Sequence, residues 1–375
     1  PPGLVAASYR ELQAARTPAL DPAELILYSA EQYGQRGFPF QPFGPDLRVR
    51  WTAGWELATG DPILVPASLV YFNYHRGRYA DEPRTNFMIM PGVATGPDRH
   101  SAARTALAEV VERDAVTLWW QRGHGATAVD TEPDGFPATL LAGPELAGPD
   151  GAIRLDYHLF QVPSDLGVPV LAALVDDQAF GVVSVGSSYH PTPRIAATKA
   201  LAEAIQLRAF SLDLRDPRSR VWRGILGGTR ATNIVKPFRA DHAYLGAGRP
   251  GFRDAIDFAA HAQLYLDPLM RGHLSRLLHP CRREPLPPAS DDDLLGVLCE
   301  AGFRTIAVDL STPDIAACGL SVVRVLVPGL YPNAPAAFPF LGGERLYHLP
   351  ENGDAQPGTR ALSSADLVRA PMPGM

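Results

Sequence analysis

The sequence predicts an α/β fold without a P-loop, because segments typical of β-strands alternate along the chain with two long segments typical of helices. The helical segments cover about residues 98–120 and 192–214. With 375 residues, of which 46% are apolar, the chain can bury a large core. It contains no internal repeat and no clear linker, so we expect one domain over residues 1–375. Within it, residues 1–35 are expected to be an N-terminal helical segment and residues 350–375 a proline-containing tail.

Local patterns predict the remaining elements. A shorter helix is expected at residues 21–34, where Asp21 and Pro22 suit the N-cap and the first helical turn. Residues 216–256 are expected to be irregular. Strands are expected where apolar and polar residues alternate, or where apolar runs end at turn residues, at positions 47–57, 63–72, 86–96 (leading into a glycine loop), 154–162, 169–177, 180–189, 304–310 and 321–330.

Composition excludes several classes of protein. The net charge is −6 and no run of Lys or Arg exceeds a pair, so we expect no nucleic acid partner. No apolar run reaches the roughly 18–20 residues that span a bilayer, and no signal peptide is evident, so we expect no membrane association. The cysteines, Cys281, Cys299 and Cys318, form no CxxC pair and are expected to be buried thiols. Together these features predict a cytoplasmic protein.

Several well-known catalytic motifs are missing from the sequence. It has no GxxxxGK[ST] loop for phosphates, no GxSxG nucleophile elbow, no HExxH zinc motif and no EF-hand loop. The histidines are scattered and no two lie four residues apart, so each is expected to be structural or exposed rather than a metal ligand. Any phosphate chemistry would therefore need a different kind of site.

The helix at 98–120 carries the first candidate site, with Glu109, Glu112 and Arg113. Carboxylates three residues apart lie on one face of a helix and repel each other there. A hard cation such as Mg²⁺ would relieve the repulsion, and it is often bound by one or two carboxylates together with substrate phosphates. The alternative is a solvated charged face. The adjacent Trp119 and Trp120 are expected to belong to the core.

The helix at 192–214 carries a second set, Glu203, Gln206 and Arg208. An acid, an amide and a guanidinium suit a nucleotide, since they can bind a metal or ribose, a base edge and a phosphate. The alternative is a Lys199–Glu203 surface pair with unrelated neighbours. Both helices contain small apolar residues that permit close approach, and each follows a strand that ends in a turn. A site for a cation and phosphates, made without a P-loop, is thus a consistent hypothesis.

Four segments in order resemble the YcaO-type ATP-dependent enzymes. The resemblance is closest to the SagD-like branch, the cyclodehydratases that form azoles in ribosomal peptides. The segments are FPFQPFGPDLRVRWTAGWELATGDPILVPASLVY, PGVATGPDRHSAARTALAEVVERDAVTLWW, ALAEAIQLR and FRTIAVDLSTPDIAACGLSVVRVLVPGLYP. The similarity extends from about residue 20 to 350. The motif E-x-x-E-R is weak by itself, whereas the four segments in order are a specific signal.

The resemblance implies a YcaO-type mixed sheet with helices, in which ATP and Mg²⁺ bind among helices over the sheet. The residues that match the family's nucleotide-binding helices are Glu109, Glu112, Arg113, Glu203, Gln206 and Arg208. Of these, the implied metal ligands are Glu109, Glu112 and Glu203. The tail is similar to the family's Pro-x-Pro-x-Pro end, which helps to build the active site, so Pro371 and Pro373 are the implied catalytic positions, with Gly374 and Met375 where a last proline is expected.

The implied reaction converts Cys, Ser or Thr of a precursor peptide to a thiazoline or oxazoline, with ATP phosphorylating the amide oxygen. The implied partners are the peptide and a separate leader-peptide-binding protein, and a homodimer is left open. Two departures are noted: Met90 and Pro91 replace an expected Ser-Asn, and the family's first E-x-x-E-R helix is expected before Pro1, so the chain would lack the N-terminal part of the domain. The alternatives are a non-catalytic scaffold subunit, or thioamide or macroamidine formation.

Overall fold

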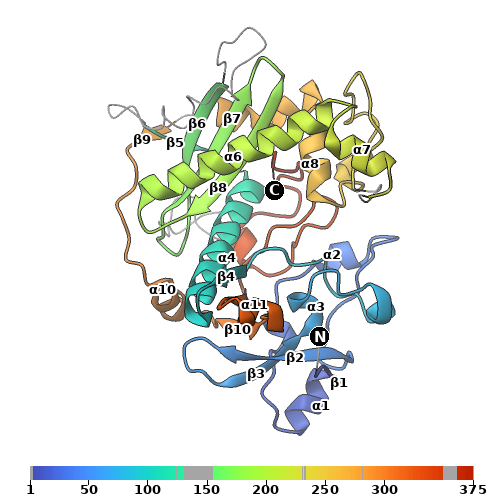
Figure 1. Ribbon diagram of the computed structural model, residues 1–375, viewed down its shortest axis with the longest axis vertical. Coiled ribbons are helices and arrows are strands. Elements are labelled where there is room, and N and C mark those ends of the chain that lie inside the picture. Colours follow the sequence, from blue (N-terminus) through green and yellow to red (C-terminus); the bar gives the residue numbers. More distant parts are fainter. Residues whose placement is uncertain are drawn as a thin grey trace. The chain divides into compact units, whose positions relative to one another are not determined.

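The computed structural model describes residues 3–123, 125–130, 155–229, 231, 234–280, 282–348 and 361–374. Contacts within the chain divide it into two compact units, each with its own sheet (Figure 1). The first unit comprises Pro1–Thr117, Asp291–Ala334 and Pro339–His348, and the second comprises Leu118–Ser290, Pro335–Phe338 and Leu349–Met375. The division of the chain into functional domains stays a prediction.

The sheet of the first unit has the order β1–β2–β10–β11–β4, with β3 paired to β2, and all its pairs are antiparallel. Its strands are β1 (Val5–Ala7), β2 (Val49–Glu56), β3 (Pro62–Pro66), β4 (Val93–Gly96), β10 (Ile306–Asp309) and β11 (Ser321–Leu326). Trp51 on β2 is fully buried, and its Nε1 donates to the carbonyl of Ala7 at 2.9 Å. This bond joins the short β1 to the centre of the sheet.

Short helices surround this sheet. They are α1 (Tyr9–Ala14), η1 (Pro22–Glu24), α2 (Ala30–Tyr33), α3 (Ala67–Val70), η2 (Gly77–Tyr79), α10 (Leu294–Glu300), α11 (Pro313–Ala317) and α12 (Arg345–His348). Two of them begin with a capping box, in which a serine and a residue three positions later bond to each other's backbone N–H, at Ser8 with Glu11 and at Ser29 with Gln32. Such local bonds let helices of four to six residues form.

The long helix expected at 98–120 is α4 (Arg99–Arg122). It begins after Asp98, whose carboxylate accepts the backbone N–H of Ser101 at 2.7 Å, as an N-cap residue does. Residues of α4 up to Thr117 belong to the first unit and the following residues to the second. The stretch from Val111 to Trp120 is buried all round, which is unusual for a helix with three consecutive charged residues.

The sheet of the second unit has the order β8–β7–β6–β5–β9 and is mixed, since β5 and β9 are parallel and the other pairs antiparallel. Its strands are β5 (Thr127–Val129), β6 (Leu155–Val162), β7 (Val170–Asp177), β8 (Val182–Tyr189) and β9 (Arg282–Glu284). The second long helix, α6 (Pro193–Arg215), lies along the face formed by β7 and β8 (Figure 1). Buried alanines of α6 let it approach β8 closely, namely Ala196, Ala197, Ala200 and Ala204.

Gly186 of β8 marks the closest approach between this strand and α6. A Cβ at this position would lie 2.3 Å from the carbonyl oxygen of Ala200 and 2.5 Å from the backbone N of Ala204. Glycine is therefore required for α6 to pack on the strand. Shorter helices complete the described part of this unit: α7 (Arg220–Leu226), η4 (Pro250–Phe252), α8 (Phe258–Leu264), η5 (Pro268–Leu274) and α9 (Ser275–Leu278).

Some local expectations are wrong. The helix expected at 21–34 is two short turns with an extended stretch between them, whose Leu25, Ile26 and Leu27 line an apolar cavity instead of a helix face. Asp21 does cap the first turn by accepting the N–H of Ala23. The strand expected at 86–96 begins only at Val93, the expected strand at 63–72 turns into α3 after Pro66, and α7 lies within the region expected to be irregular. The bounds of the two long helices and of the other expected strands are confirmed within one or two residues, except that β11 ends at Leu326 instead of at residue 330.

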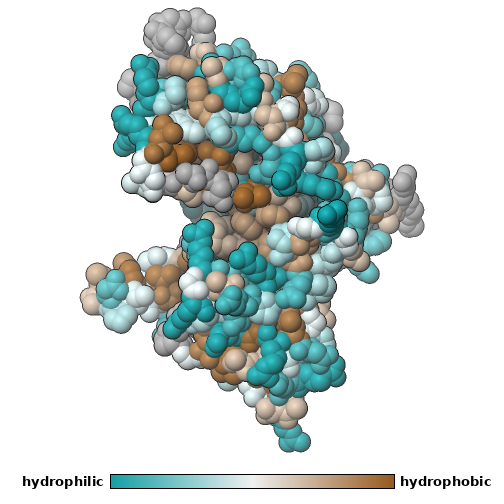
Figure 2. Space-filling model, turned by 90° about the vertical axis from the view of Figure 1, so that its right-hand side faces the viewer, coloured by the Kyte–Doolittle hydropathy of each residue, from teal (hydrophilic) through white to brown (hydrophobic). Residues whose placement is uncertain are grey.

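Polar and apolar residues are interspersed on the surface drawn in Figure 2.

Cys299 and Cys318 are exposed free thiols, so the expectation that they are buried is wrong. Cys299 lies on α10, which buries Leu294 and Leu298 instead, and Cys318 ends α11, which buries no residue. Cys281 lies outside the described residues. Among the helices described, none combines the length and apolar character needed to cross a membrane.

We predict that Gly186→Ala destabilises the protein by about 1–3 kcal/mol, because the added methyl forces α6 and β8 apart. Gly246→Ala is the matched control in the same unit, since no atom lies within 4 Å of a Cβ there. Urea unfolding of both variants measures the difference. Equal unfolding midpoints would contradict the required close approach.

Candidate functional site

Glu109 is a half-buried carboxylate on α4 in the first unit. Its Oε2 accepts the backbone N–H of Gly92 at 2.9 Å. A Cβ at Gly92 would lie 2.5 Å from the carbonyl oxygen of Val325 and 2.8 Å from Cγ2 of Val110, and φ of Gly92 is 92°. Only glycine fits this position between β11 and α4. The amide of Gly92 thus fixes one oxygen of Glu109 and leaves Oε1 without a hydrogen bond to any described residue.

Glu112 and Arg113 follow on the same helix and are both buried, at 8% and 7% exposure. Oε1 of Glu112 lies 3.3 Å from a terminal nitrogen of Arg113. The alternative of a solvated charged face therefore does not hold for Glu112 and Arg113, because the helix is enclosed on this side as well. Burial strengthens the field of each charge, so a bound cation or phosphate would interact with them more strongly than in water.

Asp114 connects α4 to a distant part of the chain. Its two carboxylate oxygens accept from both terminal nitrogens of Arg345, each at 2.7 Å, and Oδ1 also accepts the backbone N–H of Tyr331 at 2.7 Å. Asp114 is 1% exposed. A bidentate pair of this kind fixes orientation as well as distance. It therefore sets the rotation of α4, and with it the direction of Glu109 and Glu112.

The oxygen donors on α4 suit a hard cation. Mg²⁺ takes oxygen ligands and is commonly held by one or two carboxylates, with phosphates and water as its other ligands. Within the described ranges no cluster of three or more His, Cys, Asp or Glu residues could hold a metal by itself. Binding of Mg²⁺ by Glu109 and Glu112, with phosphates as further ligands, therefore stays a prediction. The set of three ligands that includes Glu203 stays a prediction.

Glu203 lies on α6 in the second unit and repeats the arrangement of Glu109. Its Oε2 accepts the backbone N–H of Ser187 on β8 at 2.6 Å. The neighbouring Gly186 allows this approach, and the hydroxyl of Ser184 donates to the carbonyl of Ala204 at 2.7 Å. A carboxylate on a helix is again held by a backbone amide, here that of the residue after a glycine.

Arg208 and Gln206 occupy very different surroundings on α6. Arg208 is buried, and its guanidinium donates through Nε to Oδ2 of Asp177 on β7 at 2.6 Å. A terminal nitrogen of Arg208 lies 2.5 Å from the same oxygen, and the ring of Phe180 lies 5.9 Å from the guanidinium carbon. Gln206 is exposed. The structure thus gives Arg208 a buried carboxylate partner, while the predicted roles of both residues toward a nucleotide stay untested.

The C-terminal tail is held in the second unit by its own carbonyl groups. The hydroxyl of Tyr265 donates to the carbonyl of Pro371 at 2.7 Å, and the backbone N of Val185 donates to that of Pro373 at 2.6 Å. Nε1 of Trp120 donates to the carbonyl of Ala370 at 2.7 Å. Residues 370–374 are buried, so this stretch is docked rather than frayed. Residues 350–360 of the expected tail, and Met375, lie outside the described residues.

Gly374 lies too close to β8 for a residue with a side chain. A Cβ at Gly374 would lie 2.4 Å from the carbonyl oxygen of Val185, and φ of Gly374 is 136°. Proline fixes φ near −65° and could not take this conformation. The docked tail and Glu203 therefore both bind the open edge of β8, at the amides of Val185 and Ser187.

A family model described as YcaO cyclodehydratase, ATP- and Mg²⁺-binding, matches residues 2–331. The chain belongs to the YcaO family. A protein of Methanothermobacter thermautotrophicus without an assigned function is 28% identical over 332 residues, which cover 83% of this chain and 70% of the relative. A protein encoded in the tfuA 3' region of Rhizobium leguminosarum bv. trifolii is 24% identical and covers 56% of this chain and 49% of the relative.

Solved YcaO structures confirm the expected fold. A heterocyclase in complex with substrate and cofactor has a TM-score of 0.68 at 21% identity and covers 99% of this chain. The heterocyclase TruD has a TM-score of 0.64 at 23% identity, with the same coverage of this chain. This chain spans 45% and 47% of those two chains, so it corresponds to less than half of each. An E. coli microcin synthetase McbBCD complex has a TM-score of 0.51 at 14% identity.

The sequence analysis of this YcaO chain missed several residues that support the candidate site. Three glycines permit close approaches that only the folded structure reveals, namely Gly92, Gly186 and Gly374. Asp114 follows directly after Glu112 and Arg113, and the sequence shows no basic residue three or four positions away from it on the helix. Its partner Arg345 lies 231 residues away. Partners this distant leave no local pattern.

We predict that Arg208→Ala lowers the free energy of unfolding by about 3–5 kcal/mol, because it leaves Asp177 charged and unpaired in the interior. Arg218→Ala is the control: its side chain is 89% exposed and pairs with the half-exposed Asp216, so its loss should leave stability unchanged. Chemical unfolding of both variants measures the effect. If Arg208→Ala were as stable as the wild type, the ion pair would not be the main role of this residue.

Proposed function

We propose that this chain catalyses the ATP-dependent cyclodehydration of Cys, Ser or Thr in a ribosomally made precursor peptide, which yields a thiazoline or oxazoline. Membership of the YcaO family supports azoline-forming chemistry in general and the binding of ATP and Mg²⁺. The observation that carries the proposal is the group of the half-buried Glu109 with the buried Glu112 and Arg113, which combines two carboxylates and a guanidinium on one helix.

In the proposed reaction, the carbonyl oxygen of the peptide leaves as part of a phosphate derived from ATP. The thiol or hydroxyl of the peptide adds to the carbonyl carbon of the preceding residue, which forms the ring bond and an oxyanion after the side chain loses its proton. The oxyanion attacks the γ-phosphorus of ATP, and ADP leaves. The amide nitrogen then loses its proton and forms a C=N bond, and phosphate leaves with the former carbonyl oxygen. The peptide loses one water, and ATP becomes ADP and phosphate.

The chain's own residues would contribute position and charge rather than a covalent step. Glu109, Glu112 and Glu203 would hold Mg²⁺, which supplies positive charge to the phosphates when it is bound. Arg113 would contact phosphate, and its burial would strengthen that contact. The two other proposed nucleotide contacts are Gln206 and Arg208, the second of which would have to act while it is paired with Asp177.

The docked tail is proposed to form the wall of the reaction site. The pyrrolidine rings of Pro371 and Pro373 fix φ near −65° and so limit the conformations of the tail. The bonds from Tyr265 and Val185 to their carbonyls make the tail rigid enough to orient a substrate amide. Displacing the tail would therefore lower turnover more than it would weaken nucleotide binding.

The proposed partners are the precursor peptide and a separate protein that binds its leader, and the proposed location is the cytoplasm. Structures of the McbBCD complex, one of them with pro-MccB17 bound, support an assembly with a peptide and further proteins. An alternative is a scaffold subunit without ATP chemistry. Two observations would favour it: Arg208 is paired with Asp177, and Met90 and Pro91 stand before Gly92.

We predict that Glu112→Gln lowers turnover by about 10²–10³-fold, because the amide retains the shape of the side chain but removes a charge that holds the cation. The assay combines the protein with its partner, ATP, Mg²⁺ and the precursor peptide. Mass spectrometry follows the loss of about 18 Da, one water, per ring, and ADP release is measured in parallel. Glu300→Gln, at an exposed position at the end of α10, is the control and should turn over like the wild type.

The alternatives give different results in this assay. A wild-type chain that binds no nucleotide and yields no dehydrated peptide would contradict the proposed reaction and support the scaffold function. Dehydration that continues at the wild-type rate in Glu112→Gln would leave the reaction intact and contradict the site on α4.

A further inference from the structure

Arg324 on β11 is a buried cation in the first unit. It is 1% exposed, and within the described parts of the chain no acidic side chain forms an ion pair with it. Burial lowers the pKa of its guanidinium to about 10, and the nearby Glu109 carboxylate acts in the opposite direction. A buried charge without an ion-pair partner is costly unless many hydrogen bonds compensate for it, so its position calls for an explanation.

The guanidinium of Arg324 binds main-chain carbonyl groups instead of an acid. It donates to the carbonyl oxygens of Ile89 at 2.5 Å, Pro91 at 2.7 Å and Leu69 at 3.1 Å, with a longer contact of 3.4 Å to Met90. Residues 89–91 form no strand or helix, so their carbonyls take part in no hydrogen bonds of a regular element. Arg324 therefore supplies the bonds that a regular element would otherwise provide.

The segment held by Arg324 leads directly to Glu109. Pro91 precedes Gly92, whose N–H donates to Oε2 of Glu109 and whose carbonyl accepts the N–H of Val325 at 2.7 Å. Any displacement of residues 89–91 would therefore move the amide that orients Glu109. The guanidinium of Arg324 thus binds the carbonyls of residues 89–91, which precede the amide of Gly92, and this amide binds the carboxylate of Glu109.

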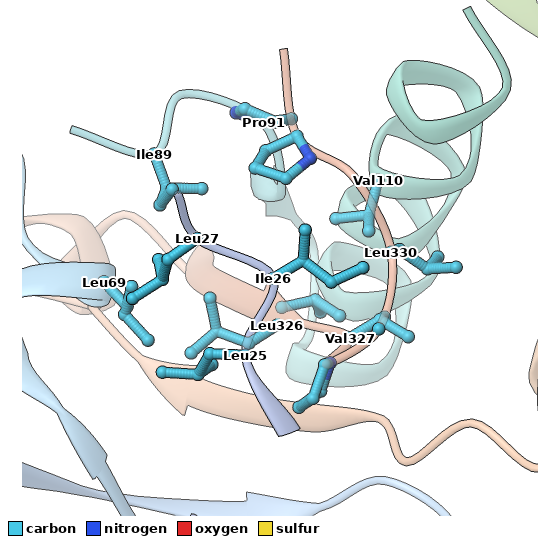
Figure 3. A pocket seen from close by; sticks show the side chains of 14 residues that line it. Leu25, Ile26, Leu27, Leu69, Ile89, Pro91, Val110, Leu326, Val327 and Leu330 are labelled. Atoms are coloured by element: carbon cyan, nitrogen blue, oxygen red, sulfur yellow. The ribbon is translucent and has the colours of Figure 1, made fainter. Parts of the chain in front are cut away.

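Side-chain packing alone does not fix this segment. Figure 3 shows the side chains of Ile89 and Pro91 facing an apolar cavity, together with Val110, the residue after Glu109 on α4. The cavity has a volume of about 70 Å³ and belongs wholly to the first unit. Side chains that border empty space have fewer contacts on that side, so the hydrogen bonds from Arg324 add a restraint that packing does not supply there.

We propose that Arg324 is a positioning residue for the cation site: its bonds to residues 89–91 fix the amide of Gly92, and thereby direct Oε1 of Glu109 toward a bound Mg²⁺. This inference rests on the proposed function, since it names a further residue of the same site. It also assigns the segment before α4 a role that depends on its main chain. The side chains of Met90 and Pro91 need not bind anything for that role.

Arg324→Lys tests the proposal, because lysine keeps the charge but is a compact ammonium that cannot reproduce the planar fork binding several carbonyls. The dissociation constant for Mg²⁺ in the presence of ATP should rise about 10–100-fold, as is typical when a residue that orients a metal ligand is lost. Arg104→Lys is the control on α4, with an exposed partner in Asp292, and should bind Mg²⁺ like the wild type. Calorimetric titration of Mg²⁺ measures the constants.

A double-mutant cycle with Glu109→Gln separates positioning from general destabilisation. If Arg324 acts through Glu109, Arg324→Lys should weaken Mg²⁺ binding in the wild-type background and have little further effect when Glu109 is already Gln. Independent, additive effects of the two substitutions would overturn the proposal. So would an unchanged Mg²⁺ constant in a folded Arg324→Lys variant.

A second pair of variants tests the segment without altering the buried charge. Met90 is 38% exposed, so its side chain can change without opening the core. Met90→Gly loosens the main chain and should weaken Mg²⁺ binding severalfold, whereas Met90→Leu should not. If Met90→Gly binds Mg²⁺ like the wild type, the segment does not position Glu109. A wild-type protein that binds no Mg²⁺ and ATP at all would overturn the proposed function itself, and this inference with it.

Discussion

The burial of three consecutive charges on α4, at Glu112, Arg113 and Asp114, is the constraint on which the first unit depends. Moving a charge out of water costs several kcal/mol unless a partner compensates for it. Asp114 is compensated by Arg345 and by the amide of Tyr331, and these bonds can form only at one rotation of the helix. The direction of Glu109 and Glu112 therefore follows from a residue that is not itself a ligand. A helix with an ordinary wet face would have no such requirement.

Glycine enables the same arrangement in both units. In each, a glutamate on a long helix accepts the amide of a residue at a strand, Gly92 for Glu109 and Ser187 for Glu203. In each, a glycine leaves no room for a Cβ between the helix and the neighbouring backbone. In both cases the amide fixes the orientation of the carboxylate. Ligands that are fixed in this way lose less conformational freedom on binding a cation than mobile surface carboxylates would.

The sequence predicted the elements with a strong local period and the side chains carried by those elements. The helices of residues 99–122 and 193–215 and the pair Glu109 and Glu112 were predicted because spacing along one helix decides them. The helix predicted at residues 21–34 is wrong, because Leu25 and its neighbours pack in extended form against segments that are distant in the sequence. The partners of Asp114 and Arg208 were not predictable, because Arg345 and Asp177 meet them only after folding. Local pattern thus supplied the candidate ligands, and long-range contacts supplied their orientation.

The tail and Glu203 are mechanically linked through β8. Val185 and Ser187 are two residues apart, and in a strand the amides of such residues point to the same edge. One of these amides binds the carbonyl of Pro373 and the other binds the carboxylate of Glu203. A shift of this edge would therefore displace a proposed metal ligand and the proposed wall of the reaction site together. Because Gly374 also lies against the carbonyl of Val185, the tail cannot slide along the strand without a steric clash. The tail and Glu203 thus share one strand edge as their support.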